Sequence, residues 1–248
     1  MPLATQVNGK ISRVQVSNLH LLYAMNCTDD RYGDFVLATA MLDLSHCVLE
    51  GVAGQELLRA EIEQERGRIA RKRRELDKAL RHYEIALRLI KAAQDEDSYR
   101  LYELYVSRGV VQVQKGDFKS GSADYEKAWV LAQKLQLTEQ IFVYQLLQSR
   151  ATLALRKEDY ITCERLASEA ADLLTLKASQ RHGDIALARQ RQGVALCHLR
   201  DFERGRQVLS EAQREFELAG TFDEHRSQLE TYLAVTSGKI DLSRPSEM

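Results

Sequence analysis

Three arginines recur at one fixed interval and are the residues of this sequence best suited to binding chemistry. Arg66, Arg108 and Arg150 stand 42 residues apart, and Gln192 ends the series. A guanidinium group presents a rigid fork of donors that binds carboxylates and phosphates at two points. Three such groups on equivalent elements would form a ladder that binds an acidic partner. Alternatively, each arginine pairs with a carboxylate of a neighbouring helix or lies along the surface.

Other chemistries find less support. The stretch 116–122 has the glycine spacing of a phosphate-binding loop, but Ser122 stands where that loop needs a lysine. The six histidines form no HExxH pair. In His46-Cys47 and Cys197-His198 the adjacent side chains would point to different helix faces, a poor geometry for one metal ion. We therefore expect no catalytic residues, no metal site and no cofactor.

A cluster of positive charge lies between residues 68 and 74. It comprises Arg68, Arg71, Lys72, Arg73 and Arg74. Acidic residues flank the cluster on both sides, and no aromatic residues interleave with it to stack on bases. A solvated helix end is therefore favoured over a nucleic-acid patch, and nucleic acid is not expected as a partner.

Charge and composition exclude several classes of protein. The 248 residues include 35 basic and 36 acidic ones, so a net charge of −1 gives no bias toward nucleic acids or anionic membranes. No window reaches about 18 apolar residues, and residues 1–26 lack the apolar core of a signal peptide. The four cysteines form no CxxC pair, which suits a reducing compartment. A cytoplasmic protein with no membrane contact is expected.

The elements that must position the arginines repeat with the same interval. Four columns share the period of 42 residues: Gly67, Gly109, Ala151 and Gly193; Leu76, Phe118, Tyr160 and Phe202; Ala79, Gly121, Cys163 and Gly205; Ala86, Ala128, Ala170 and Ala212. Such self-similarity marks a stacked repeat architecture. Both prolines lie at the chain ends, and apolar residues recur at helical spacing. Each repeat therefore predicts two antiparallel helices, over 59–73 and 76–93, 99–115 and 118–135, 139–156 and 160–175, and 183–199 and 202–219.

The turn inside each predicted pair carries its own signal. Basic residues close the first helix and acidic ones open the second, as where Lys115 precedes Asp117 and Arg200 precedes Asp201. Each such charge stabilises its helix end by about 0.3–1 kcal/mol, so the turns are specified electrostatically.

Outside the four repeats of residues 59–219 the period weakens. Gly33-Asp34-Phe35 repeats Gly116-Asp117-Phe118, which predicts a degenerate helical hairpin over 12–58. A capping helix is expected over 220–239, and flexible tails over 1–11 and 240–248. The predicted architecture is all-α: a right-handed α–α superhelix of about five hairpins with a C-terminal capping helix.

The repeats resemble the tetratricopeptide repeat (TPR). The resemblance rests on Gly-Asp-Phe and its variants before the second helix, on the small residue three positions later, and on the alanine column. It is also carried by Tyr83, Tyr125 and Leu209. The units lack the proline that usually ends a TPR and are longer, as in the subclass found in kinesin light chains and in sensor regions of bacterial transcription regulators. The resemblance implies a solenoid that binds proteins or peptides and performs no catalysis.

In the TPR family the first helix of each repeat lines the inner, concave surface, so the resemblance implies a polar groove. Its lining would be Gln64, Arg68, Arg71, Ser107, Val110, Gln114, Gln145, Gln148, Ser149, Thr152, Gln190, Arg191 and His198. Together with Arg108 and Arg150 of the ladder, this lining suits an extended peptide that carries acidic groups. The Lys and Asn arrangement with which chaperone-binding members hold a terminal carboxylate is not found at matching positions.

Two functions remain in competition at this stage. The leading hypothesis is a cytoplasmic, non-catalytic scaffold or adaptor, including the sensor part of a regulatory system, that binds a protein or peptide in the groove. The alternative is a structural protein whose exposed end helices stack on another copy, with a symmetric dimer as the common outcome.

Overall fold

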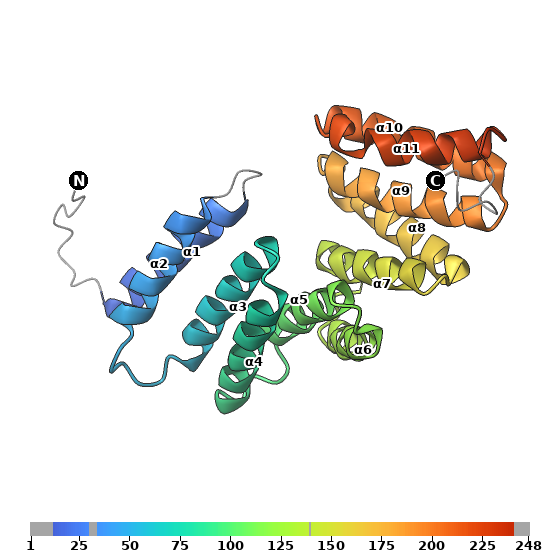
Figure 1. The fold of residues 1–248 in the computed structure, drawn as a ribbon. Helices are drawn as coiled ribbons and strands as arrows, with labels where there is room; N and C mark the ends of the chain where they lie inside the picture. The colour runs from blue at the N-terminus through green and yellow to red at the C-terminus, as the bar shows by residue number, and fades with distance from the viewer. Residues whose placement is uncertain (1–11, 30–33, 139, 241–248) are drawn as a thin grey trace. The chain divides into compact units, whose positions relative to one another are not determined.

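The computed structural model describes residues 12–29, 34–138 and 140–240 (Figure 1). These segments contain eleven α-helices and no strand, so the all-α prediction is confirmed. The predicted tails, 1–11 and 240–248, lie outside the described residues except for residue 240.

The helices follow one another with short connections. Their bounds are α1 Arg13–Asp29, α2 Phe35–Val48, α3 Glu56–Lys72, α4 Leu76–Ala92, α5 Tyr99–Gln114, α6 Phe118–Lys134, α7 Tyr144–Arg156, α8 Tyr160–Lys177, α9 His182–His198, α10 Phe202–Leu218 and α11 Phe222–Thr236. The helix α7 begins later than the predicted 139–156, of which residue 139 lies outside the description. The delay arises because Ile141–Val143 wind as a separate 3-10 turn before it.

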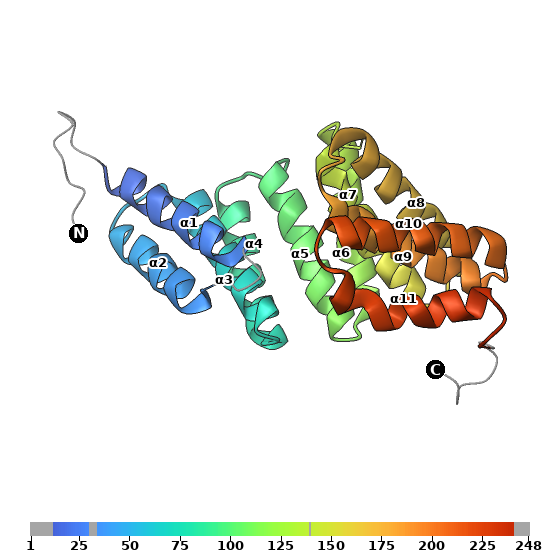
Figure 2. The same ribbon diagram turned by 90° about the horizontal axis from the view of Figure 1, so that it is seen from above.

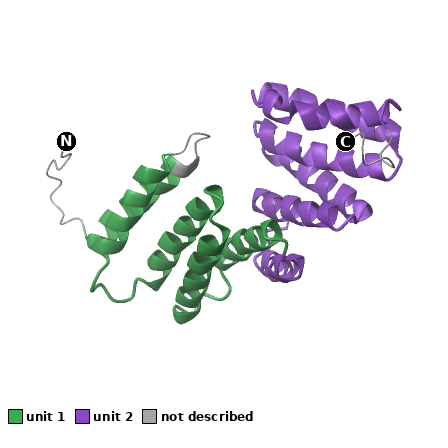
Figure 3. Ribbon diagram, viewed as in Figure 1, with its two compact units in different colours: residues 1–116 green, residues 117–248 purple. Residues whose placement is uncertain are grey.

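The chain forms two compact units, residues 1–116 and 117–248 (Figure 3). In the first unit α1 packs on α2, and α3 packs on α4. In the second, α7 packs on α8, and α9 lies against α8, α10 and α11 (Figure 2). Consecutive helices therefore pair as antiparallel hairpins within each unit, and apolar side chains such as Leu42 and Ile62 in the first unit and Leu209 in the second fill the space between them.

The turn at the start of each second helix is held by a carboxylate. Asp117, Asp159 and Asp201 each accept a hydrogen bond from the backbone N–H three residues later, at 3.0–3.3 Å. This N-cap satisfies a donor that has no partner inside the helix and contributes about 1 kcal/mol. At the same position before α4, the Glu75 carboxylate pairs with Lys78 at 3.2 Å. The acidic residues seen in the sequence thus act mainly as caps.

A glycine on the first helix lets the second helix approach closely. A methyl group placed on Gly67 would lie 2.3 Å from Cε1 of Tyr83, whose side chain is fully buried. On Gly193 it would lie 2.5 Å from Cγ of Leu209. The recurring glycine column therefore marks the contact between the two helices of a hairpin, and the large residue sixteen positions later fills the space that the glycine leaves.

Candidate functional site

Three helices of the second unit form the face on which predicted groove residues meet. The helix α9 contacts both α7 and α11. From these helices come Gln148 and Thr152 of α7, Gln190 and Arg191 of α9, and Gln228 of α11. We call this set the unit-2 face. Residues 148 and 152 are one helical turn apart and therefore share a side of α7.

Arg191 lies at the centre of the unit-2 face. Its Nη1 donates to the carbonyl oxygen of Leu187 at 3.0 Å and to Oε1 of Gln148 at 3.4 Å. Asp184 acts on the guanidinium only through its field, because its carboxylate forms an ion pair with Arg181 at 2.8 Å. Among the residues that the structure describes, Arg191 makes no ion pair. Burial lowers the pKa of Arg191, which reflects a positive charge with little compensation.

Amide side chains surround this charge and are held in place by hydrogen bonds. Gln148 donates through Nε2 to the carbonyl oxygen of Asp184 at 2.9 Å, which directs its Oε1 toward Arg191. Gln190, which is buried, donates to Oε1 of Gln228 at 3.0 Å and so joins α9 to α11. His225 of α11 lies close enough for the charge of Arg191 to lower its pKa, after burial as the main cause. The face therefore offers both donors and acceptors around one cation.

The remaining predicted residues of this unit lie nearby but differ in their contacts. Gln145 is exposed and donates to the Tyr144 hydroxyl at 3.1 Å. The Thr152 hydroxyl donates to the carbonyl oxygen of Gln148 in its own helix at 2.9 Å. His198 stacks on Tyr160 with ring centroids 4.3 Å apart, and burial lowers its pKa. His198 is therefore held within a ring stack.

In the first unit the predicted groove residues are largely occupied by neighbours. Gln64 is only 9% exposed, which leaves little of its side chain for a partner. Arg68 pairs with the buried Glu65 at 2.8 Å. The guanidinium of Arg108 lies 5.6 Å from the centre of the Tyr105 ring. Arg71 and Ser107 are partly buried on α3 and α5.

The arginine column makes contacts between successive hairpins. Arg66 of α3 pairs with Asp43 of α2 at 2.7 Å. Arg150 of α7 pairs with Glu126 of α6 at 3.0 Å, and its guanidinium lies 5.2 Å from the Trp129 ring. At the fourth position Gln192 donates to Glu164 of α8 at 3.2 Å. Arg66 and Arg150 thus pair with a carboxylate of the preceding hairpin, as the pairing alternative describes, whereas Arg108 lies against the Tyr105 ring of its own helix.

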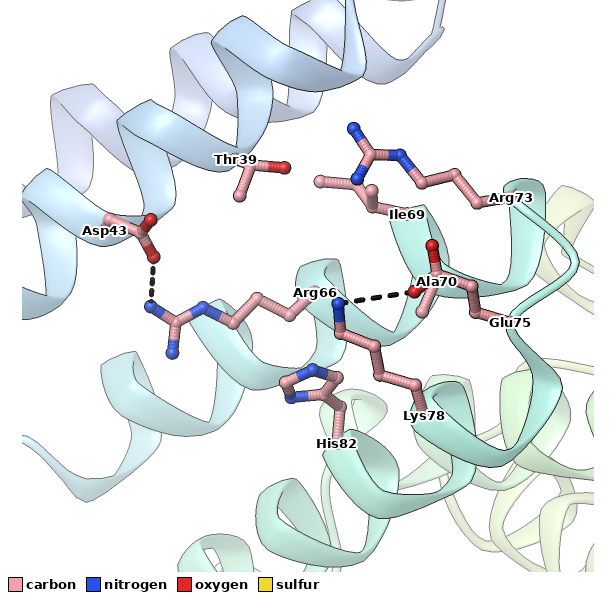
Figure 4. Close-up of a pocket in the computed structure, with 9 residues that line it drawn as sticks. All are labelled: Thr39, Asp43, Arg66, Ile69, Ala70, Arg73, Glu75, Lys78 and His82. Atoms are coloured by element: carbon pink, nitrogen blue, oxygen red, sulfur yellow. Dashed lines mark hydrogen bonds and ion pairs between the residues drawn. The ribbon is translucent and has the colours of Figure 1, made fainter.

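A pocket of about 230 Å³ opens beside Arg66 in the first unit (Figure 4). Lys78 and Arg66 extend toward it from α4 and α3, and each meets a carboxylate, Glu75 and Asp43 respectively. Arg73 also lines the pocket and lies 5.7 Å from the centre of the Phe35 ring. Because these cations already have partners, the pocket keeps little charge for an incoming anion.

Glu63 contacts two residues that line the pocket, His82 and Arg66. Its Oε2 lies 2.7 Å from Nδ1 of His82, and its Oε1 accepts from Arg66 at 2.7 Å. Burial alone would raise the pKa of Glu63, but the hydrogen bonds from His82 and Arg66 and their charges lower it overall. This carboxylate is consequently a structural link between α3 and α4.

Sequence reasoning missed several residues of the unit-2 face. Gln228 and His225 were assigned only to a capping helix, and Asp184 and Arg181 were not considered. The sequence carried no signal for Gln228, because its contact with Gln190 depends on the packing of α11 on α9. No group of three or more potential metal ligands gathers within the described part of the chain. None of the described helices is long and apolar enough to cross a membrane.

Comparisons with known proteins bear on the fold. No protein-family model matches the chain, and no curated protein sequence matches it. Among solved structures, the chain is similar to BtubC (BKLC) from P. vanneervenii, with a TM-score of 0.68 and 17% sequence identity. The match covers 83% of this chain and 80% of BtubC. The fold is therefore TPR-like: an all-α arrangement of sequential antiparallel helix pairs.

Proposed function

We propose that the chain is a non-catalytic binding protein that holds an acidic segment of a protein or peptide partner on the unit-2 face. The observation that carries the proposal is the partly buried guanidinium of Arg191, which has amide and carbonyl partners but no ion pair within the described residues. The suitable role is that of a scaffold or adaptor, including the sensor part of a regulatory system, since its output is binding.

The physical reason lies in the cost of an uncompensated charge. Removing a guanidinium from water without a counter-charge is unfavourable, and a carboxylate supplied by a ligand would recover that cost. A carboxylate accepts two parallel hydrogen bonds from the guanidinium fork, whereas neutral groups accept weaker ones. The amides of Gln148 and Gln228 add donors and acceptors that suit the backbone of an extended peptide.

The test begins with selection of binders from a random dodecapeptide library displayed on phage, using the full chain. The selected peptides should carry Asp, Glu or a free terminal carboxylate. Their affinity, measured by fluorescence anisotropy, should fall about 10- to 100-fold for Arg191→Gln, since a charged hydrogen bond contributes about 1.5–3 kcal/mol. Replacing the acidic group of the peptide by its amide should cause the same loss in the wild type and no further loss in the variant.

Arg165→Gln is the matched control. Arg165 lies on α8, its side chain is 64% exposed, and it pairs with Glu169 at 3.7 Å. Its loss should leave peptide affinity within about twofold, because exposed pairs contribute little. Equal affinity of the selected peptides for wild type and Arg191→Gln would refute the assignment of this face, and so would a library that yields no binder.

A second readout needs no ligand. If Arg191 serves binding and not folding, then Arg191→Met should raise the free energy of unfolding of the free protein by about 0.5–2 kcal/mol, as for other residues kept for function. A lower stability in urea unfolding would assign Arg191 a structural role instead.

A further inference from the structure

Between its two terminal residues, Arg13 and Asp29, the outward side of α1 carries apolar and amide side chains. Residues 14–28 contain no Asp, Glu, Lys or Arg. Leu19, Leu22 and Tyr23 are 67%, 58% and 51% exposed. Leu22 and Tyr23 follow Leu19 by three and four residues, so both lie on the same side of the helix as Leu19. Exposed amides extend the same stripe at both ends. We call this set the α1 stripe: Gln15, Asn18, Leu19, Leu22, Tyr23 and Asn26.

The opposite side of α1 is fully engaged. Leu21 and Ala24 are buried in the core shared with α2 and α3. The hydroxyls of Ser17 and Ser45 are buried and lie 2.6 Å apart, which fixes α1 on α2. The α1 stripe is therefore presented by a helix of fixed orientation.

The exposed side of α11 differs from the α1 stripe in its charge. The exposed residues of α11 include four charged ones: Asp223, Glu224, Arg226 and Glu230. Charged side chains of this kind keep an exposed helix face soluble. The α1 stripe has none, although all of its residues are exposed. Val36 and Leu44 on α2, 74% and 46% exposed, add apolar surface to the hairpin of α1 and α2.

We propose that the α1 stripe is an interface that binds the α1 stripe of a second copy of this chain around a two-fold axis. In such an interface each residue near the axis meets its own counterpart, so a charged residue would meet a like charge. A stripe of apolar and amide side chains avoids this repulsion. Asn and Gln carry both donors and acceptors and can hydrogen-bond to an identical residue, which makes the stripe complementary to itself.

The size of the surface sets the strength of the dimer. A helix of 17 residues is about 25 Å long and about 10 Å wide, so α1 supplies a footprint of about 250 Å² and the hairpin about twice that. A stable interface buries about 800 Å² on each partner. Because this footprint is smaller than that of a stable interface, the dimer is weak and reversible.

Analytical ultracentrifugation of the full chain tests the proposal over protein concentrations of about 1 to 300 µM, where weak interfaces associate. The wild type should pass from monomer to dimer across this range. Leu19→Glu should raise the dissociation constant more than about 100-fold, because two carboxylates are then desolvated next to each other. Leu218→Glu on α10 is the matched control: Leu218 is also 67% exposed, and its variant should dimerise as the wild type does.

Thermal melts followed by circular dichroism show whether each variant folds; Leu22→Glu serves as the second variant should Leu19→Glu melt early. A wild type that stays monomeric throughout the range overturns the proposal, and so does equal loss of dimer in Leu218→Glu. A variant that lacks residues 2–11 distinguishes two possible occupants of the α1 stripe: a second copy of the chain and residues 2–11 themselves. Unchanged dimerisation supports a second copy, whereas a dimer that forms only after this deletion assigns the stripe to residues 2–11.

Discussion

Adding one methyl group to Gly67 should destabilise the protein, although glycine is a poor helix former. In Gly67→Ala the new Cβ would lie 2.3, 2.6 and 2.9 Å from Cε1, Cδ1 and Cζ of Tyr83. Carbon atoms in contact lie about 3.5–4.0 Å apart, so the ring or the helix must move by more than about 1 Å. Tyr83 is fully buried, so its ring can move only by displacing neighbouring side chains of the core.

The magnitude follows from two opposing terms. Overpacking a tight core costs about 1–3 kcal/mol, and the size of this clash places it at the upper end. Alanine in place of glycine inside a helix returns about 0.5–1 kcal/mol. We expect a net loss of about 2 kcal/mol in the free energy of unfolding and a melting temperature lower by about 4–8 °C. Urea unfolding and thermal melts, both followed by circular dichroism, measure the two quantities.

Gly205→Ala provides the matched control. Its Cβ would meet the Cys197 sulfur at 3.4 Å and Cγ2 of Thr236 at 3.5 Å, close to ordinary contact distances. The gain in helix propensity should then prevail, leaving the protein as stable as the wild type or more stable by up to about 1 kcal/mol. A Gly67→Ala protein that matches this behaviour would refute the close approach of α3 and α4.

The third repeat shows how the clash is avoided. Its equivalent positions hold Ala151 and Ala167, both fully buried, so the larger residue on one helix is matched by a smaller one on the other. In a Tyr83→Ala background, Gly67→Ala should therefore no longer destabilise. The same loss in both backgrounds would mean that the methyl group acts through something other than Tyr83.

Two further predictions concern titration. Because the pKa of Glu63 is lowered in the folded state, its charge stabilises the fold above its ordinary pKa, and this stabilisation is lost as the pH falls through the folded-state pKa. At about pH 7 the free energy of unfolding of the wild type should exceed that of Glu63→Gln by about 2 kcal/mol. This difference should shrink below about pH 4. A gap that stays constant with pH would contradict the role of the carboxylate charge. Burial raises the pKa of Cys163 and of Cys197 to about 11. A disulfide reagent at neutral pH should therefore modify the exposed Cys47 first and the two buried thiols only as the protein unfolds. Rapid modification of Cys163 in the native state would contradict its burial.

The fold could be predicted because the same local sequence features recur in the repeats. The glycine column, the acidic caps and the helical spacing of apolar residues each depend on neighbours within one hairpin, and one sequence period reports them several times. The start of α7 could not be predicted in this way. Within the described segments, the 3-10 turn at Ile141–Val143 is found in one connection and has no counterpart in the other repeats.

Burial of polar residues was harder to predict than helix formation. Glu63, Gln64 and Glu65 are three consecutive polar residues, and all are buried in α3. Two of them pair with cations: Glu63 with Arg66 and Glu65 with Arg68. A polar side chain on a first helix indicates a groove only when no such partner is near, and partners such as His82 lie on another helix.

The contrast between Arg150 and Arg191 shows where the candidate site originates. One repeat after Arg150 stands Gln192, so Arg191 is displaced by a single residue from the arginine column. Neighbouring residues on a helix point about 100° apart, so Arg191 does not occupy the position from which Arg150 meets Glu126. Arg191 instead meets Gln148 of the preceding first helix, and the described structure gives it no carboxylate partner. A one-residue shift within an otherwise regular repeat thus replaces an arginine that pairs with a carboxylate of the preceding hairpin by one that has no carboxylate partner among the described residues.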